Sequence, residues 1–318
     1  MPMSGQTVAD IGEFGLIAAL QPRLRTSAAV EVASGDDAAV VRLGAERLVV
    51  STDMLVQDRH FRLEWSSPED IGRKAAAQNI ADLSAMGARP VALTAAIALP
   101  PQTSVEWVLG VVDGLVAEAA EVGAVVVGGD VTRAENVTIS VTAMGVPAGS
   151  RLVPRNGAEP GDVVAICGRL GWAAAGLAVL GRGFKSPRVV VDAHRRPHPP
   201  YAAGPAAAAA GATAMIDVSD GLLADLGHIA DASGVQIVLD PQLLPIDDQV
   251  RATASAFNAD PLGWVLAGGD DHALAATFSS DASLPDGFEI VGEVLAGSGV
   301  EVPGYRHIGA PGYDHFRE

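Results

Sequence analysis

The fold is decided by the stretch Gly35-Asp36-Asp37-Ala-Ala-Val-Val-Arg-Leu-Gly44-Ala-Glu-Arg-Leu-Val-Val-Ser51-Thr52-Asp53. Two short apolar, β-branched runs flank the break at Gly44, which is the pattern of a β-hairpin. With 44–46 as the loop, Leu43 is predicted to face Arg47, and Asp37 to face Asp53. Carboxylates held that close repel one another, so a cation is expected between them. Taken alone, however, the stretch favours a merely solvated acidic turn, and the rest of the sequence has to decide.

Length and composition restrict the class of protein. A chain of 318 residues, 49% apolar and 4% aromatic, suits two α/β domains with cores of small side chains. The net charge of −17 argues against nucleic acid and anionic membranes as partners. The sequence has 24 Asp but 14 Glu, and short Asp side chains in loops are typical of hard-cation sites. With the single Cys167 and no apolar leader or membrane-length run, we expect a cytoplasmic protein.

The first half of the sequence is predicted to combine helices and strands. Ser67, followed by Pro68 and two acids, predicts the start of a helix that ends at Gly87. Within it, Asn79 and Asp82 stand three residues apart and therefore share one face. The other elements expected in this half are helices over 8–25 and 104–121 and strands over 90–99, 124–127 (of the buried type) and 137–146.

A Pro-, Gly- and Arg-containing stretch at 147–161 predicts the boundary between an N-terminal domain, residues 1–148, and a C-terminal domain, residues 149–318. In the second half, an Ala-rich helix is expected after Gly171. By default, either Ser219 or Asp220 would cap a helix over 222–232, but two acids three residues apart, Asp217 and Asp220, with a hydroxyl between them exceed what capping needs. Strands are expected over 162–167, 214–218, 235–239 and 273–278, and irregular loops over 185–205 and 240–262.

Acidic residues recur beside apolar strands in both halves. The clusters are Asp36, Asp37 and Asp53; Asp130; Asp217 and Asp220; and Asp270 and Asp271. The zinc pattern H-E-x-x-H, a cysteine pair and the EF-hand spacing are all absent, so the oxygen donors favour Mg²⁺. Because Mg²⁺ completes its coordination with substrate phosphates, the clusters predict an acidic pocket that binds a polyphosphate through bridging metals.

The motifs also occur in a recognisable order. They read G-D-D-A, S-T-D with H-F downstream, N-I-A-D-L-S-A-M-G-A, G-G-D-V-T-R, D-V-S-D-G-L-L-A-D-L-G-H, G-G-D-D-H and G-Y-D-H-F. Each motif is weak alone, but together and in this order they closely resemble the thiamine-monophosphate kinase family. That family belongs to the superfamily of AIR synthase and selenophosphate synthetase. The resemblance extends over nearly the whole chain, from Gly12-Glu13-Phe14 to Phe316.

The resemblance implies an activity and a set of site residues. The family transfers the γ-phosphoryl group of ATP to thiamine monophosphate, giving thiamine diphosphate and ADP. The positions that match its metal ligands, for several Mg²⁺ ions, are Asp37, Ser51, Thr52, Asp53, Asp82, Asp130, Asp217 and Asp220. ATP-binding positions are Gly129, Asp130, Arg155 and Ser219, and acceptor-binding positions are His60, Asp270 and Tyr313. The chain departs from the family at Asp270-Asp271, usually Glu-Asp, and at His272, usually a bulky aromatic residue.

The family fold implied by the resemblance is α/β, with two AIR synthase-like domains. The N-terminal sheets of two subunits form a shared barrel, so a homodimer is expected, and the C-terminal domain is an α/β sandwich. The acceptor is a phosphate monoester with a second pKa near ~6, so it is already ionised at neutral pH. We therefore expect direct, Mg²⁺-assisted in-line transfer with no general base and no covalent nucleophile.

Three other interpretations stay open at this point. The first is another enzyme of the same superfamily: selenophosphate synthetase, AIR synthase or a hydrogenase maturation factor. Selenophosphate synthetase would be expected to have a reactive cysteine, and Cys167, in a predicted buried strand, argues against it. A non-catalytic protein that binds ATP and Mg²⁺ is the second interpretation, and a metal-dependent phosphatase is the third. With the other clusters in view, the hairpin end is interpreted as a metal site. Asp37 is assigned to the metals, and Asp36, on the opposite strand face, to a supporting position.

Overall fold

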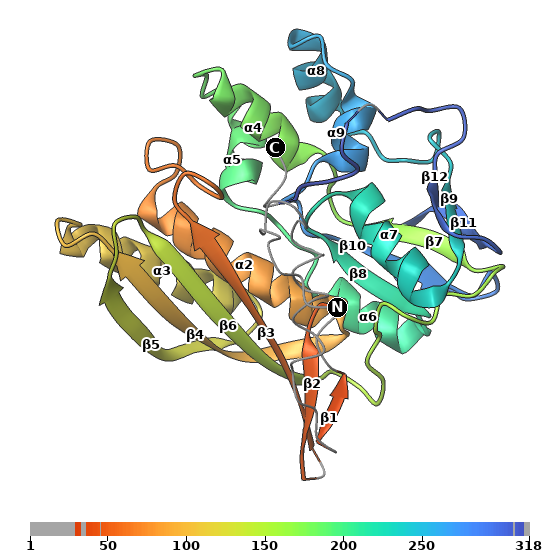
Figure 1. Ribbon diagram of the computed structural model, residues 1–318, viewed down its shortest axis with the longest axis horizontal. Coiled ribbons are helices and arrows are strands. Elements are labelled where there is room, and N and C mark those ends of the chain that lie inside the picture. The colour runs from red at the N-terminus through yellow and green to blue at the C-terminus, as the bar shows by residue number, and fades with distance from the viewer. Residues whose placement is uncertain (1–28, 33–35, 45, 308, 315–318) are drawn as a thin grey trace, which may run out of the picture.

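The structure, a computed structural model, describes residues 29–32, 36–44, 46–307 and 309–314 (Figure 1). Its strands form two six-stranded sheets, one from each half of the chain, and helices pack against both. The predicted α/β class is confirmed. The helix expected over 8–25 lies outside the described residues. None of the helices in the described part of the chain has the length and apolar character needed to span a bilayer.

The first sheet is curved and covered by helices on one face (Figure 1). Its strands, in order across the sheet, are β1 (Val30–Val32), β2 (Ala39–Leu43), β3 (Glu46–Val56), β6 (Thr138–Pro147), β4 (Ala88–Leu99) and β5 (Val125–Arg133). The covering helices are α2 (Pro68–Ala85) and α3 (Val105–Glu121). Along β3, Val49 and Leu55 are buried towards these helices, whereas Met54 is exposed on the other face. This alternation decides which side chains of β3 reach the space beneath α2.

The second sheet lies in the C-terminal half and is mostly antiparallel. Its order is β12 (Gly299–Glu301), β9 (Gln236–Leu239), β11 (Phe288–Leu295), β7 (Val163–Cys167), β10 (Ala273–Phe278) and β8 (Ala214–Val218). The helices of this half are α4 (Trp172–Gly181), α5 (Arg188–Arg195), α6 (Ala203–Ala210), α7 (Leu222–Ser233), α8 (Asp248–Ala256) and α9 (Pro261–Ala267). Strands β7, β8 and β10 are almost completely buried, which explains their uninterrupted apolar sequences.

Helix α2 lies where the two halves meet (Figure 1). Its predicted start is confirmed: Ser67 accepts the backbone N–H of Asp70, whose carboxylate accepts that of Ser67 in return, and Pro68 occupies the first turn. One side of α2 packs on β3, β4 and β6, and another contacts β8 and α6. Ala75, Ala76 and other small residues allow this close packing, so polar side chains of α2 reach the space between the sheets.

The hairpin of β2 and β3 exists, but its predicted register was wrong by one residue. Leu43 pairs with Glu46 and Arg42 with Arg47, so the connection is a two-residue loop. Gly44 has a φ of 66°, as such tight loops require. The ladder ends at Ala39, and Asp37 lies in a bend before β2 rather than opposite Asp53.

Two other expectations were also wrong. The strand expected to be buried at 124–127 is part of β5, an exposed strand at the sheet edge that contains the Gly-Gly-Asp motif. The expected loop over 185–205 contains α5 and the start of α6. The expected loop over 240–262 contains α8 and the start of α9. The sequence did carry signals for two of these helices, because Asp247 and Asp260 each accept a backbone N–H at a helix start. In α5, buried Val190 and Val191 supply the packing.

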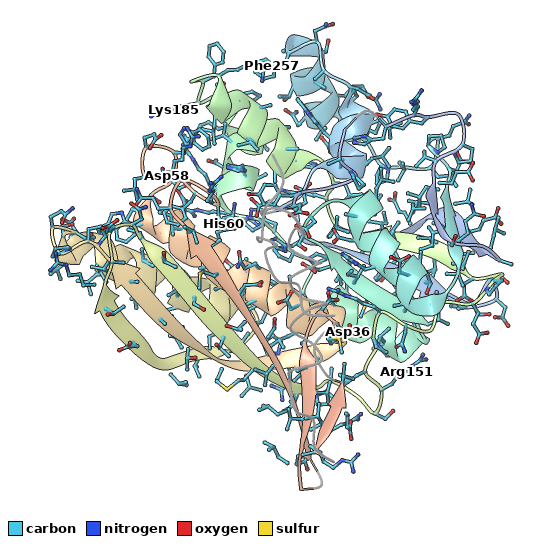
Figure 2. All side chains as sticks on the ribbon, viewed as in Figure 1. Asp36, Asp58, His60, Arg151, Lys185 and Phe257 are labelled. Carbon is cyan, nitrogen blue, oxygen red and sulfur yellow. The ribbon has the colours of Figure 1, made fainter. Side chains whose placement is uncertain are left out.

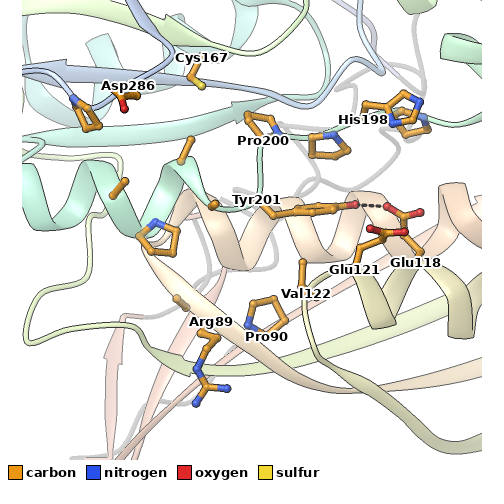
Figure 3. A pocket seen from close by; sticks show the side chains of 18 of the residues that line it. Arg89, Pro90, Glu118, Glu121, Val122, Cys167, His198, Pro200, Tyr201 and Asp286 are labelled. Atoms are coloured by element: carbon orange, nitrogen blue, oxygen red, sulfur yellow. Dashed lines mark hydrogen bonds between the residues drawn. The ribbon is translucent and has the colours of Figure 1, made fainter.

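A cavity of about 1020 Å³ separates the two halves on one side of α2 (Figure 3). Tyr201, just before α6, reaches across it and donates a hydrogen bond to Glu118 Oε1 of α3 at 2.7 Å. Arg73 of α2 donates to the other carboxylate oxygen, Glu118 Oε2, at 3.0 Å. Glu118 is therefore a buried carboxylate with partners from both halves.

We expect Tyr201→Phe to lower the free energy of unfolding by about 1–3 kcal/mol, because a buried carboxylate oxygen loses its donor. Urea denaturation measures the loss. The matched control is Tyr305→Phe, which removes an exposed hydroxyl that donates to Asp260 and should change stability by less than about 0.5 kcal/mol. Equal losses in the two variants would contradict the assigned role of the Tyr201–Glu118 contact.

Candidate active site

A pocket of about 760 Å³ opens between the two halves of the chain on another side of α2. Several residues predicted from the sequence line it together: Asp53, His60, Ser219, Asp220, Asp270 and Tyr313. His60 lies beyond the end of β3 and faces the C-terminal half (Figure 2). Its Nδ1 accepts the backbone N–H of Val56 at 2.9 Å, so the neutral imidazole carries its proton on Nε2. The pocket also has aromatic walls, Phe61, Trp65 and Trp264, that the sequence did not predict.

One group of predicted residues meets where β3 passes beneath α2. Ser51 and Asp53 are two residues apart on β3 and share the face towards the helix. The Ser51 hydroxyl donates to Asp82 Oδ2 at 2.5 Å, and Asn79 Oδ1 accepts the backbone N–H of Asp53 at 2.9 Å. The shared helix face predicted for Asn79 and Asp82 therefore has a structural use, because it fixes β3 against α2.

Four carboxylates, Asp37, Asp53, Asp82 and Asp217, form what we call the acidic cluster. Burial and then the charges of the other three raise the pKa of Asp82 well above its usual range. Burial also raises the pKa of Asp37 to about 7, with Asp217 adding to the shift and the Arg155 guanidinium opposing it. Like charges that perturb one another in this way lie close together, although they come from four different segments of the chain.

The acidic cluster fits a divalent cation by its chemistry. All its donors are oxygens, and Asp37 Oδ2 is buried without a hydrogen-bond partner. Among the residues that the structure describes, no three His, Cys, Asp or Glu side chains are placed to bind one ion by themselves. Such an arrangement suits Mg²⁺, which takes one or two carboxylates and completes its coordination with water and phosphate oxygens.

Arg155 balances part of this negative charge. Its guanidinium Nε donates to Asp37 Oδ1 at 3.1 Å and an NH2 group donates to the same oxygen. Asp36 supports the pair, because its carboxylate accepts the backbone N–H groups of Asp37 and Arg155, both at 3.0 Å. Arg155 belongs to the connection between the two sheets, so this ion pair joins the acidic cluster to the C-terminal half. Its role in ATP binding stays a prediction.

The Gly-Gly-Asp-Asp-His loop approaches the cluster from the C-terminal half. His272 Nδ1 lies 2.8 Å from Asp217 Oδ2, and its Nε2 lies 3.8 Å from Asp270 Oδ1. Burial alone would lower the pKa of His272, but these two carboxylates raise it to about 10. The imidazole is therefore protonated at neutral pH and links Asp217 of the cluster to Asp270 of the pocket.

This loop is held in an unusual backbone conformation. Asp270 and His272 have φ values of 73° and 52°, a left-handed region that costs about 1–3 kcal/mol for a residue with a side chain. Their backbone N–H groups donate to Ser219 O at 2.7 Å and to Val218 O at 2.9 Å. Between them, Asp271 Oδ1 accepts the backbone N–H of Ala173, at the start of α4, which has no capping side chain of its own.

The start of α7 differs from the default expectation. Its N-cap is Gly221, without a side-chain cap, so neither Ser219 nor Asp220 caps this helix. Instead, Asp225 Oδ2 accepts the backbone N–H groups of Asp220 at 3.1 Å and Gly221 at 3.0 Å. Ser219 and Asp220 line the pocket.

Thr52 does not meet the acidic cluster. It lies between Ser51 and Asp53 on β3 and therefore points to the opposite, open face of the first sheet. There its hydroxyl donates to Val141 O at 2.9 Å and contacts the Thr142 hydroxyl at 3.0 Å. Metal binding by Thr52 stays a prediction.

Gly129 and Asp130 are also remote from the cluster within one chain. In the sheet, Gly129 pairs with Ala95 of β4, which pairs with Val141 of β6, which in turn pairs with Asp53. Three strand spacings of ~4.8 Å therefore separate Gly129 from Asp53, about 14 Å in all. Both motif residues are exposed on the edge strand β5.

Sequence reasoning missed Lys74, a buried residue of α2 whose ammonium pairs with the Asp270 carboxylate. Its signal was available: Lys74 is one of only two lysines in the chain, and it precedes the apolar run Ala75-Ala76-Ala77. A lysine in such surroundings needs a buried partner. The aromatic walls of the pocket, by contrast, have no spacing that would reveal them.

Comparisons with known proteins agree with this arrangement. The chain matches the families described as AIR synthase related protein, N-terminal domain, over residues 35–147, and AIR synthase related protein, C-terminal domain, over residues 159–303. It is 48% identical over 314 residues to a thiamine-monophosphate kinase of Mycobacterium tuberculosis, covering 98% of this chain and 94% of the relative. The Corynebacterium glutamicum thiamine-monophosphate kinase is 44% identical over 299 residues, covering 91% and 88%.

Solved structures give the same result. The structure described as AaThiL complexed with AMPPCP and TMP superimposes with a TM-score of 0.91 at 30% identity, covering 98% of this chain and 99% of that one. The thiamine monophosphate kinase from Aquifex aeolicus superimposes with a TM-score of 0.84, also at 30% identity, covering 94% and 98%. A HypE–HypF complex, at 21% identity and a TM-score of 0.69, shares the fold alone. The chain therefore belongs to the thiamine-monophosphate kinase family.

Proposed function

We propose that the protein transfers the γ-phosphoryl group of ATP to thiamine monophosphate, giving thiamine diphosphate and ADP. One observation carries the proposal: a single pocket joins the acidic cluster, through Asp53, to the acceptor-binding positions His60, Asp270 and Tyr313. A relative with the same fold is described in complex with AMPPCP and TMP. The superfamily alternatives are less well supported, because the HypE structures share the fold at low identity and Cys167 is buried in β7.

Within this site, the acidic cluster, with Ser51 and Asp220, would hold several Mg²⁺ ions. Bound Mg²⁺ supplies charge neutralisation and alignment of the transferring phosphoryl group. The chain itself positions the two substrates: Ser219 and Arg155 on the nucleotide side, and His60, Asp270 and Tyr313 on the acceptor side. Phe61, Trp65 and Trp264 give the pocket aromatic walls.

The proposal predicts direct transfer. The acceptor phosphate is ionised at neutral pH, so no side chain has to remove a proton. This is consistent with the site, because His60 Nδ1 accepts a backbone N–H and the carboxylates of Asp217 and Asp270 raise the pKa of His272 to about 10, which makes it a poor base. No residue needs to become phosphorylated during the reaction.

The deciding experiment is an assay of purified protein with ATP, Mg²⁺ and thiamine monophosphate. Formation of thiamine diphosphate and ADP in equal amounts supports the kinase. Release of inorganic phosphate from thiamine monophosphate without ATP would identify a phosphatase, and binding of ATP without turnover a non-catalytic protein. A labelled protein band after incubation with radioactive ATP alone would contradict direct transfer.

We also propose that the protein is a homodimer joined through the first sheet. Strand β5 forms the edge of that sheet and exposes Val125, Val127 and Val131, the last of them 66% exposed. A long, apolar, unpaired edge strand is a template for pairing with another chain. A two-fold interface there would carry Gly129 and Asp130 of one subunit towards the acidic cluster of its partner. It would thereby explain how two residues that match site positions lie far from the acidic cluster of their own chain.

Mixed dimers test this arrangement. Asp53→Ala and Asp130→Ala homodimers should each be inactive, whereas subunits mixed by co-expression should recover about a quarter of wild-type activity, because half the dimers contain one intact site. Recovery requires that Asp130 acts across the interface. Inactive mixed dimers, or a monomer by sedimentation, would contradict the arrangement.

The remaining proposals concern the domains and the location of the protein. We propose that residues 1–148 carry the dimer interface and most metal ligands, and that residues 149–318 complete the nucleotide and acceptor sites. The free, buried Cys167 and the use of ATP favour a cytoplasmic location.

A further inference from the structure

The side chain of Lys74 carries an ammonium group that is almost completely buried. Its side chain is 3% exposed, in the middle of α2. The Nζ atom donates to Asp270 Oδ2, to the backbone carbonyl of His60 at 3.1 Å and to that of His194 at 3.4 Å. These three acceptors use the three N–H groups of the ammonium completely. A buried lysine is rare unless it is paired, and here each acceptor comes from a different segment.

Two of the three oxygens that accept hydrogen bonds from Lys74 belong to residues at the positions expected to bind thiamine monophosphate. Asp270 and His60 both line the pocket, one from the C-terminal half and the other from the N-terminal half. One ammonium from α2 therefore connects the backbone of His60 to the carboxylate of Asp270. The burial of Asp270 alone would raise its pKa, but Lys74, together with His272 and His194, outweighs burial and holds that pKa well below its usual range.

Asp270 needs such an anchor because of its backbone. It lies in the left-handed region, in a loop whose neighbour His272 is also left-handed. Lys74 holds Asp270 Oδ2, while His272 Nε2 lies 3.8 Å from Asp270 Oδ1. The carboxylate is thus paired with Lys74 of the N-terminal half and lies beside His272 of its own half, so its orientation depends on how the two halves meet.

We propose that Lys74 is a positioning residue for the phosphate acceptor, which orients Asp270 and fixes His60 without touching the substrate. The inference rests on the proposed function. It assigns Lys74 a role in binding thiamine monophosphate and none in binding ATP. Nucleotide positions Arg155 and Ser219 receive no contact from it among the hydrogen bonds of the described residues. Loss of the ammonium should therefore weaken thiamine monophosphate binding and leave ATP binding unchanged.

The test is Lys74→Met, which keeps the length of the side chain and removes its charge. We expect the KM for thiamine monophosphate to rise at least about tenfold, with the KM for ATP and kcat within about threefold of wild type, because the lost interaction serves binding of one substrate. The matched control is Lys185→Met, the same substitution at the only other lysine, which is exposed. It should leave all three constants unchanged.

A second comparison separates positioning from a merely structural ion pair. If Lys74 acts through Asp270, then Lys74→Met added to Asp270→Asn should raise the acceptor KM by less than about twofold over Asp270→Asn alone. Lys74→Arg, which keeps the charge, should restore part of the acceptor affinity. Should Lys74→Met fail to fold, Lys74→Arg and Asp270→Asn carry the same comparison of the two KM values.

Several results would overturn the inference. A lowered melting temperature with an unchanged acceptor KM would make the pair structural, and a parallel rise in both KM values would assign Lys74 to the whole site. Fully additive effects in the double variant would exclude action through Asp270. These outcomes all require an active wild-type enzyme; a wild type that forms no thiamine diphosphate would instead refute the proposed function.

Discussion

Asp82→Asn should lower kcat about a thousandfold and, at the same time, stabilise the metal-free protein by about 1–2 kcal/mol. The two effects have one cause. Burial, and then the charges of Asp53, Asp217 and Asp37, raise the pKa of Asp82, so an uncharged amide of the same shape removes both penalties in the absence of metal. The Asn oxygen can still accept the Ser51 hydroxyl, and the local structure is kept. Catalysis is lost because the cluster has one fewer carboxylate for cations.

Activity and thermal unfolding in EDTA measure the two effects on the same preparation. The matched control is Asp231→Asn, an exposed acid on α7, which should change neither. An Asp82→Asn enzyme that is both inactive and less stable would show that Asp82 serves folding. One that keeps normal activity would remove the acidic cluster from the mechanism.

The stability of the metal-free protein should fall by about 4 kcal/mol between pH 6 and pH 8. The pKa values of Asp37 and Asp271 are raised from 3.8 to about 7. Their contribution is complete below the unfolded pKa and is lost as the pH rises through 7, because the folded state then carries buried negative charge. His272, with its pKa raised to about 10, acts in the same direction above 6.5. His194, lowered to about 4, opposes them only below 6.5.

Mg²⁺ should reverse this trend. Protons compete with the cation for the carboxylates, so Mg²⁺ should stabilise the protein more at pH 8 than at pH 6. Urea denaturation at both pH values, in EDTA and in excess Mg²⁺, gives the four free energies needed. Equal stabilisation at both pH values would mean that Mg²⁺ does not bind at the titrating carboxylates.

The sequence predicted those elements that local chemistry specifies. Ser67 was predicted to start one helix and residue 104 another, and both helices begin where expected, with Ser67 and Ser104 as their caps. The hairpin register was missed because the sequence does not distinguish a three-residue loop over 44–46 from a two-residue loop. A difference of one residue in the loop shifts every later pair of the ladder. Likewise, the apolar run at 124–127 indicates burial without saying whether the covering surface is the chain's own core or another subunit.

Those residues of the candidate site that belong to sequence motifs could be predicted. The pocket confirms that Asp53, His60 and Asp270 lie together. The sequence could indicate that Lys74 is buried, but not that its partner is Asp270, 196 residues further along the chain. Contacts of that separation depend on how the two sheets pack. Periodicity and caps specify single elements, so they do not contain this information.

Helix α2 also has a consequence for substrate choice. Lys74, which pairs with Asp270 of the pocket, and Asp82, in the acidic cluster, stand about two turns apart on α2, ~12 Å along its axis. If the protein acts as proposed, this spacing selects substrates by length: an acceptor bound at the Asp270 end must extend far enough to present its phosphoryl oxygens to the acidic cluster. The dephosphorylated alcohol of the same acceptor would be too short. An insertion of one residue between the two positions would turn Asp82 away by about 100° and abolish this selection.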